Sequence, residues 1–227
     1  MTDFIKISYT AKIKDGRVFD TTREDIAKKE GIYDEKRTYK PLPIVVGEGH
    51  VVRGLDEALE GMKVGKEKTI EIPPEKGYGK RNPDLIRIVP LRKFKEQKIT
   101  PIPGMPIEID GKIARVQTVA GGRVRVDFNP ELAGKILIFD VKIEERARTR
   151  EDKIKFLLER SFNSSDNFGI KQAKKSLTIT IPESAYKDRN ILARKASFTA
   201  ETFKYLDINK IKFDEVWEKE RERKNKK

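Results

Sequence analysis

Four short stretches that together contain glycine turns and aromatic residues most constrain the fold of this 227-residue chain. Three of them follow one another within the first eighty residues, and the fourth comes only after almost sixty more: residues 15–20, 51–55, 75–79 and 137–141. Aromatic side chains and a lone Asp among glycine turns indicate an apolar binding cup that contains no nucleophile. The interval before the fourth stretch indicates a unit inserted into the rim of the cup, because insertion is tolerated best where loop ends lie close together.

Composition excludes several kinds of site. Hydrophobic residues make up 37% of the chain and charged residues 38%, which is typical of a heavily charged globular protein. We find neither an apolar run of membrane-spanning length nor a secretory leader pattern, so we expect a cytoplasmic protein with no membrane partner. Cysteine is absent and His50 is the only histidine, which argues against disulfides, thiolate catalysis, a zinc cage and a Ser-His-Asp triad. We expect no metal and no cofactor.

The net charge of +13 is unevenly distributed. Residues 1–79 together with 128–141 carry 16 Lys/Arg against 17 Asp/Glu, residues 80–127 carry 11 against 5, and residues 142–227 carry 23 against 15. The stretches with the glycine motifs are therefore almost neutral, and the basic excess lies in two added units. A basic surface attracts polyanions and acidic chains. High charge is also a solubility strategy, and Lys/Glu enrichment is common in thermophiles, so charge alone leaves both interpretations open.

Periodicity predicts a small antiparallel α+β fold for the first eighty residues. Alternating apolar residues over 4–13, followed by Asp15-Gly16, predict a β-hairpin. Two helices and two strands complete this unit, over residues 22–31 (Thr22 as N-cap, Gly31 as stop), 54–61, 44–46 and 67–73.

The remaining sequence divides into two further units. Five prolines and tight turns between residues 80 and 127 predict a three-stranded meander with little helix. Beyond residue 146 we expect an α/β unit with helices over 153–162 and 188–206, strands over 176–181 and from 211, and a frayed basic tail. The predicted domains are 1–81 with 128–148, the inserted 82–127, and 149–227.

In order and spacing these motifs resemble the FKBP-type peptidyl-prolyl cis-trans isomerases. The resemblance rests on Tyr9 and on residues 16–21, 51–55, 78–79 and 139–141. The interruption is similar to the SlyD-like branch and its long archaeal members, in which a chaperone domain called the insert-in-flap interrupts the isomerase. The resemblance implies an FKBP-type antiparallel sheet wrapped on a short helix, an inserted small β-rich domain and a C-terminal α/β domain. Residues 1–146 carry this resemblance, whereas residues 151–227 resemble only the extra domain of the long archaeal members.

The resemblance also implies a proline-binding pocket lined by Tyr9, Phe19, Asp20, Val51, Val52, Leu55, Tyr78, Leu132 and Phe139. Leu55 would form the floor, which is Trp in the short FKBPs. The Tyr78 hydroxyl and the Val52 amide would hold the peptide, while Asp20 would act electrostatically beside the carbonyl that precedes proline. Rotation about a peptide bond has a barrier of about 18–20 kcal/mol and needs no acid or base, only a pocket that prefers the twisted amide. Each aromatic residue alone fits a core as well as a pocket, so the prediction rests on their joint occurrence.

Two features depart from the family pattern. The usual Asn-His-Pro-Leu-Ala-Gly segment is Asn-Pro-Glu-Leu-Ala-Gly at residues 129–134, which places the rim near Leu132 in question. The tail is rich in Lys, Arg and Glu and lacks the His and Cys residues of bacterial SlyD, so we expect no nickel binding.

The insert carries a surplus of apolar residues for its size, which predicts an exposed groove for unfolded chains. Phe94, Ile99 and Met105 are the candidate client-binding residues. The basic residues of the insert suit acidic clients or ribosomal RNA, and residues 149–227 suit homodimerisation or a larger client surface. The leading hypothesis is therefore a prolyl isomerase and chaperone for nascent or unfolded chains that contain X-Pro. The alternative is a non-enzymatic module that docks on RNA, the ribosome or an acidic partner.

Overall fold

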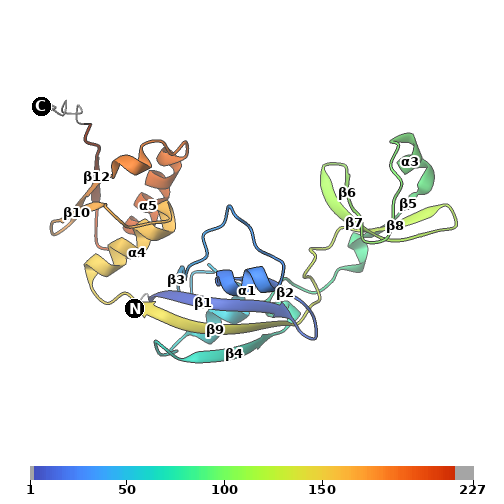
Figure 1. Cartoon of the computed structure of the whole chain (residues 1–227), viewed down its shortest axis with the longest axis horizontal. Coiled ribbons are helices and arrows are strands. Elements are labelled where there is room, and N and C mark those ends of the chain that lie inside the picture. Colours follow the sequence, from blue (N-terminus) through green and yellow to red (C-terminus); the bar gives the residue numbers. More distant parts are fainter. Residues whose placement is uncertain (1–2, 218–227) are drawn as a thin grey trace, which may run out of the picture.

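The computed structural model describes residues 3–217, and most of the basic tail that we expected to fray lies outside them. Figure 1 shows three units, each with its own sheet: a central unit, an inserted unit on one side and a C-terminal unit on the other. The predicted α+β class and the FKBP-type arrangement of the central unit are confirmed.

The central sheet is built from segments on both sides of the insert. Its strands are β1 (Phe4–Ile13), β2 (Val18–Thr21), β3 (Leu42–Val45), β4 (Glu67–Ile72) and β9 (Leu137–Arg146). The strand order is β2-β1-β9-β4, all neighbours are antiparallel, and β3 pairs with the first half of β1. Because β9 lies between β1 and β4, the sheet cannot close until the chain has returned from the insert.

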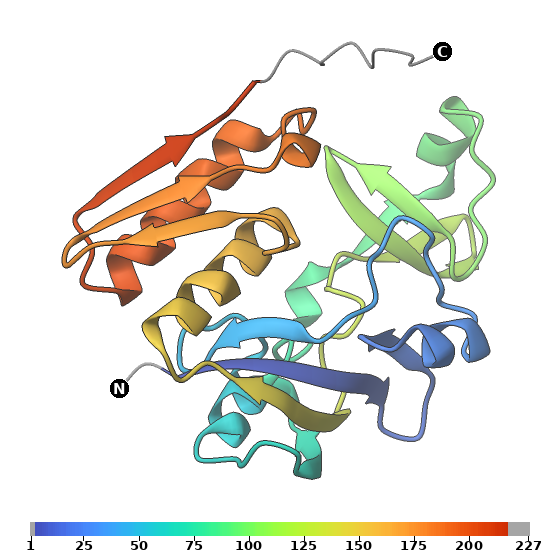
Figure 2. The same cartoon turned by 60° about the vertical axis from the view of Figure 1, so that its left-hand side comes forward.

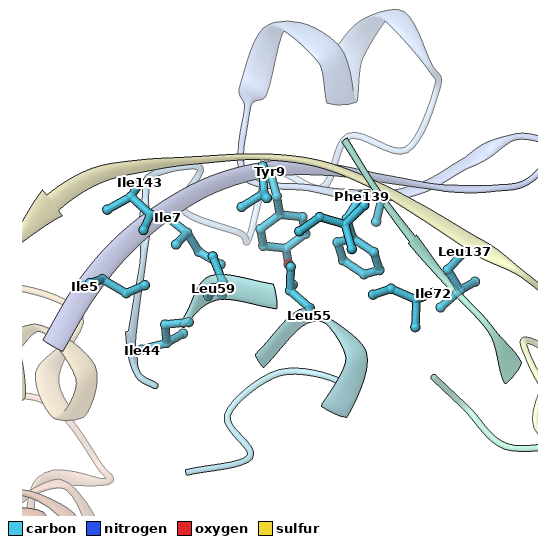
Figure 3. Close-up of a cluster of buried hydrophobic side chains, with 13 residues drawn as sticks. Ile5, Ile7, Tyr9, Ile44, Leu55, Leu59, Ile72, Leu137, Phe139 and Ile143 are labelled. Atoms are coloured by element: carbon cyan, nitrogen blue, oxygen red, sulfur yellow. The ribbon is translucent and has the colours of Figure 1, made fainter. Parts of the chain in front are cut away.

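Two short helices accompany this sheet. α1 (Glu24–Lys29) follows β2, and α2 (Arg53–Leu59) buries Leu55 and Leu59 against the concave face of the sheet. Figure 3 shows these two leucines beneath the side chains of β1 and β9. The expectation that Thr22 caps α1 is wrong: Arg23 occupies the N-cap position, and the Thr22 hydroxyl instead accepts from the Tyr9 N–H at 2.8 Å.

The inserted unit is a four-stranded antiparallel sheet with one helix. Its elements are β5 (Ile86–Pro90), α3 (Leu91–Glu96), β6 (Pro106–Ile109), β7 (Lys112–Ala120) and β8 (Arg123–Asp127), in the order β5-β8-β7-β6. The predicted meander corresponds to β6–β8, but α3 and the pairing of β5 with β8 were missed. With six residues α3 is too short for a periodic signal, and it is held because Phe94 packs into the small core of the insert.

The two connections to the insert lie side by side. Asn82 N–H donates to the side-chain oxygen of Asn129 at 2.8 Å, and the Asn129 amide donates back to the Asn82 carbonyl at 2.9 Å. Asp127 pairs with Arg81 across the same junction. The ends of the interrupted loop are thus joined by hydrogen bonds, so the insert can be carried without opening the central sheet.

The C-terminal unit packs two helices on a small mixed sheet. Its elements are α4 (Arg150–Phe162), β10 (Gly169–Gln172), β11 (Ser176–Thr180), α5 (Ile191–Tyr205) and β12 (Lys210–Asp214). β12 runs parallel to β11, and β10 runs antiparallel to it. The sequence did not reveal β10, because its Gly-Ile-Lys-Gln carries a single large apolar residue.

The C-terminal unit shares its core with the end of the central sheet. Phe4 of β1 is fully buried and its ring meets Phe156 edge-on at 5.3 Å and Tyr205 at 5.7 Å. Lys6 pairs with Glu159, and Arg160 donates to the Pro43 carbonyl at 2.8 Å. Figure 2 shows α4 lying over the edge of the central sheet where β3 runs. Among the described residues, no helix has both the length and the apolar character to cross a bilayer.

Candidate functional site

The floor of the predicted cup lies in the main hydrophobic cluster of the central unit. Tyr9, Leu55 and Phe139 are 8%, 1% and 5% exposed, and they come from β1, α2 and β9. Figure 3 shows the Tyr9 and Phe139 rings side by side above Leu55. Strand alternation explains this arrangement, because inward-facing residues of two paired strands meet over the helix that covers them.

Aromatic contacts connect this floor to the surface. The Tyr9 and Phe139 rings lie 5.7 Å apart, and the Phe19 ring meets Phe139 edge-on at 6.3 Å. Phe19, Val51 and Val52 are half-buried and pack against the same cluster. Six of the nine predicted pocket residues therefore form one continuous apolar group that is buried at Leu55 and accessible at Phe19.

Asp20 is held at the edge of this apolar group by two partners. The Tyr9 hydroxyl donates to one carboxylate oxygen at 2.6 Å, and Arg37 donates to the other at 2.6 Å. Burial, followed by the hydrogen bond to Asp20, raises the pKa of the Tyr9 hydroxyl well above its ordinary value. Tyr9 thus remains a protonated donor at neutral pH, and Asp20 is oriented rather than available as a base.

The segment that carries Val51 and Val52 is anchored by a buried carboxylate. Asp56 is 7% exposed, and it accepts from the N–H groups of Gly47 at 2.9 Å and Gly49 at 3.0 Å. Val52 is the N-cap residue of α2, and its carbonyl accepts from Asp56 N at 3.0 Å. The helix makes no use of the N–H at its N-cap, so the Val52 N–H is suited to hold a peptide carbonyl.

Tyr78 and Leu132 form the outer rim with Phe19. These three side chains, together with Ile32 and Val18, line a surface cavity of about 420 Å³. Tyr78 is 44% exposed, and partial burial, with a smaller contribution from the charge of Asp20, raises the pKa of its hydroxyl. The loops of Tyr78 and Leu132 are tied together because Gly134 N–H donates to the Gly79 carbonyl at 2.8 Å. Gly79 has φ +83°, a conformation that favours glycine.

Glu131, one of the two residues that depart from the family motif, bridges two units at this rim. Its carboxylate accepts from Arg17 of the hairpin at 2.8 Å and from Arg115 of β7 at 3.2 Å. All three side chains are at least half exposed, so these pairs contribute little to stability. Their effect is to orient the insert relative to the hairpin, and Leu132 still reaches the cavity beside them.

A larger hollow, of about 720 Å³, lies on the other face of the central sheet. Its floor is made by Ser8, Thr10 and Asp140, whose side chains alternate with those of the cup. Several of the polar groups there are paired with each other, for example Asp140 with Thr69 at 2.6 Å and Lys142 with Glu144 at 2.9 Å. Ile26 and Pro41 also line this hollow, but nine of its thirteen lining residues are charged or carry an aliphatic hydroxyl. A proline ring requires apolar walls, so the smaller, mostly apolar cavity is the better candidate.

The client-binding residues expected in the insert are less exposed than predicted. Phe94 is 4% exposed and belongs to the core of the insert, so it is not part of an exposed groove in this structure. Ile99 and Met105 are half-buried and pack against that core. The most exposed apolar side chains are instead Ile88, Ile102 and Ile113, at 65%, 60% and 77%. Ile88 and Ile113 lie in short strands whose pattern does not show which face will be covered, and Ile102 lies in the loop before β6.

Sequence reasoning also missed groups that position the site. Arg37, Ile32, Thr22, Asp56 and Glu131 act through contacts with residues far away along the chain or in another unit. The sequence did show Glu131 as a departure from the family motif, but not its pairing with Arg17 and Arg115. Arg37 and Ile32 lie in a loop with no periodic pattern, and the sequence holds no signal for them.

Comparison with known proteins agrees with this geometry. A short-type peptidyl-prolyl cis-trans isomerase of Methanocaldococcus jannaschii is 43% identical over 143 residues, which are 63% of this chain and 90% of that protein. The chain belongs to the FKBP-type peptidyl-prolyl cis-trans isomerases. Within this family, SlyD of Vibrio cholerae is 32% identical over 152 residues, 65% of this chain and 68% of that protein. An FKBP-type 16 kDa isomerase of Escherichia coli is 27% identical over 145 residues, 62% of this chain and 89% of that protein.

Two family models match the inserted unit and the C-terminal unit. The model described as "FKBP26, IF domain" matches residues 87–132, and that described as "FKBP26 C-terminal" matches residues 150–218. The recognition of an FKBP-type chain with these extra parts is thereby confirmed.

Proposed function

We propose that this chain catalyses cis-trans isomerisation of X-Pro bonds in folding polypeptides and also binds unfolded chains. The observation that carries the enzymatic part is the apolar group of Tyr9, Phe19, Leu55 and Phe139, with Tyr78 at its rim. It supplies walls for a proline ring and a protonated hydroxyl for a carbonyl, and it needs no acid, base or cofactor. Preferential binding of the twisted amide is sufficient, because that state has lost the resonance that makes the rotation slow.

Asp20 and Tyr9 support this proposal through their geometry. Hydrogen bonds to both oxygens hold the Asp20 carboxylate in one orientation, so its negative charge keeps a constant position beside the cavity. A preorganised charge does not have to reorient during the rotation, and this is the main way in which a protein stabilises a transition state electrostatically.

For chaperone activity we propose that the insert binds clients through exposed apolar side chains at its surface. Ile88, Ile102 and Ile113 are candidates by exposure, while Ile99 and Met105 stay candidates at its half-buried margin. The insert is tethered at the rim of the cavity, so a client that it holds presents its prolines to the cup at a high effective concentration.

The experiment that tests this division of labour compares two assays. A variant lacking residues 82–127 is expected to retain turnover of a short X-Pro peptide, because none of the nine predicted pocket residues lies in the deleted segment. The same variant is expected to lose at least about tenfold in proline-limited refolding of a whole protein, since client capture is lost. Equal losses in both assays, with the variant folded by circular dichroism, would contradict the proposal.

The excess of basic residues in the insert favours a second candidate, binding to RNA without catalysis. Residues 80–127 carry 11 Lys/Arg against 5 Asp/Glu, which suits ribosomal RNA as well as acidic clients. Within the leading proposal, we assign the same basic surface to docking on the ribosome and to attracting acidic clients. We assign residues 149–227 to homodimerisation. Filter binding of ribosomal RNA in rising salt, and sedimentation of the full chain, measure each separately. Tight, sequence-selective RNA binding at physiological salt in a chain that turns over no X-Pro peptide would favour the non-enzymatic candidate.

A further inference from the structure

The acidic residue at the edge of the cavity is paired with a cation from a distant loop. Asp20 lies on β2, and Arg37 comes from residues 30–41, the connection between α1 and β3. The Arg37 guanidinium donates to Asp20 Oδ1 at 2.6 Å, while the Tyr9 hydroxyl occupies Oδ2. The two charged side chains are 40% and 31% exposed, so the pair lies at the surface where a bound peptide would pass.

The loop holds Arg37 in place before any ligand binds. The Tyr33 and Tyr39 rings stack at 5.5 Å, and the Arg37 guanidinium lies over the Tyr39 ring at 5.3 Å. The Tyr39 hydroxyl accepts from the Asp34 N–H at 2.9 Å, and Arg37 N–H donates to the Asp34 carbonyl at 3.1 Å. A guanidinium that is stacked on an aromatic ring loses little further conformational freedom when it pairs with a carboxylate.

Both ends of this loop are connected to functional parts. Ile32 lines the same cavity as Phe19 and Tyr78. At the other end, Lys40 contacts the Asn163 carbonyl of the C-terminal unit, and Arg160 of α4 donates to the Pro43 carbonyl. The loop is thus part of the cavity wall and is held from outside by the third unit.

The pairing changes the charge that a substrate meets. An unpaired carboxylate at the cavity edge would repel an acidic residue and attract a basic one within about a Debye length, roughly 8–10 Å at physiological salt. Asp20 directly follows Phe19, which lines the cavity with Tyr78, and its charge contributes, after burial, to the raised pKa of Tyr78. With Arg37 in place the pair is neutral overall, and the other charged groups at this rim, Arg17 and Glu131, are also paired with each other.

We propose that Arg37 positions Asp20 and sets the substrate preference of the site, by making it tolerant of acidic as well as apolar residues before proline. This inference rests on the proposed isomerase activity. Arg37 acts through Asp20 and is a positioning residue rather than a catalytic one.

The test compares Arg37→Gln with the wild-type chain on three peptides that differ only in the residue before proline: Glu, Leu or Lys. Rates are measured by NMR exchange, which needs no coupling protease. The variant is expected to lower kcat/KM for Glu-Pro relative to Leu-Pro by about three- to tenfold and to raise the value for Lys-Pro, because the Asp20 charge is then uncompensated. The change is expected to shrink in 0.5 M salt, roughly as screening requires.

Three further variants separate this role from a structural one. Lys36→Gln removes the same charge from the neighbouring exposed position and is expected to preserve the wild-type order of the peptides. Combining Asp20→Asn with Arg37→Gln is expected to lower overall turnover but to restore the wild-type order of the three peptides, since both charges are gone. Arg37→Lys keeps the positive charge and is expected to restore that order in part. If Arg37→Gln changes kcat/KM for all three peptides by the same factor, the inference is overturned. If the wild-type chain accelerates none of them, the proposed function itself fails.

Discussion

Phe139 shows at the scale of a single residue how core and site are joined. Its side chain is 5% exposed, and it contacts the rings of both Tyr9 and Phe19. Sequence alternation on β9 predicted that it would face inward, but a core position and a pocket position have the same pattern. The structure distinguishes them, because Phe19 continues the same apolar group out to the cavity.

Phe139→Ala is expected to lower the free energy of unfolding by about 3–5 kcal/mol and the turnover of a short X-Pro peptide by at least about tenfold. The physical reason is a cavity beneath Tyr9 and Phe19, which lets the pocket wall collapse. Ile143→Val on the same strand provides the control, with a smaller stability loss and unchanged turnover. Urea unfolding and NMR exchange measure the two effects, and full activity of a folded Phe139→Ala chain would contradict the pocket assignment.

At the scale of an element, α2 presents a carboxylate that organises the loop before it. Asp56 on this helix accepts from Gly47 N–H and Gly49 N–H, and the segment so held leads to Val51 and Val52. Helical spacing over residues 54–61 predicted the helix itself. It did not predict that a charged residue would be buried, because the partners of Asp56 are backbone groups of a preceding loop.

Asp56→Ala is expected to lower the free energy of unfolding by about 2–4 kcal/mol, because it leaves two backbone N–H groups without their acceptor. The substitution is also expected to raise KM for an X-Pro peptide by a larger factor than it lowers kcat, since Val51 and Val52 then lose their fixed position. The adjacent exposed Glu57→Ala is the matched control and is expected to change neither value appreciably. Equal effects of the two substitutions in urea unfolding would refute the anchoring role.

At the scale of the whole molecule, a histidine marks the junction between the central and C-terminal units. His50 Nδ1 accepts from Val45 N–H at 3.0 Å, and Arg160 of α4 lies 3.2 Å from Nε2. Burial and the Arg160 charge lower the pKa of His50 below its ordinary 6.5, against weaker opposing effects of Glu201, Glu48 and Asp56. A protonated ring would lose the Val45 hydrogen bond and face the Arg160 charge.

The free energy of unfolding is therefore expected to fall as the pH drops through 6.5 toward the lower pKa of the folded state, because the unfolded chain binds the proton more readily. His50→Asn keeps an acceptor near Val45 N–H but does not titrate. Urea unfolding of both chains between about pH 5 and 8 tests this prediction. The free energy of unfolding of the wild-type chain, relative to that of His50→Asn, is expected to increase as the pH rises. A difference that is independent of pH would show that His50 does not sense protonation at this junction.

Most of the elements and the apolar part of the site could be predicted because their signals are local. The Asp15-Gly16 turn, strand alternation around Tyr9 and Phe139, and the helical spacing of Leu55 and Leu59 each follow from a few neighbouring residues. The exposure of Phe94 was mispredicted because a short helix buries or exposes its side chains according to what packs on it.

By itself, then, the sequence determined an interrupted antiparallel sheet with an aromatic cup and two added basic units. Only the tertiary structure decided that Arg37 neutralises Asp20, that Glu131 joins Arg17 to Arg115, and that Phe4 completes the core of the C-terminal unit. The physical reason is the range of the interactions. Turns and periodic faces are encoded by adjacent residues, whereas these contacts depend on where loops and whole units come to lie once the sheet has closed.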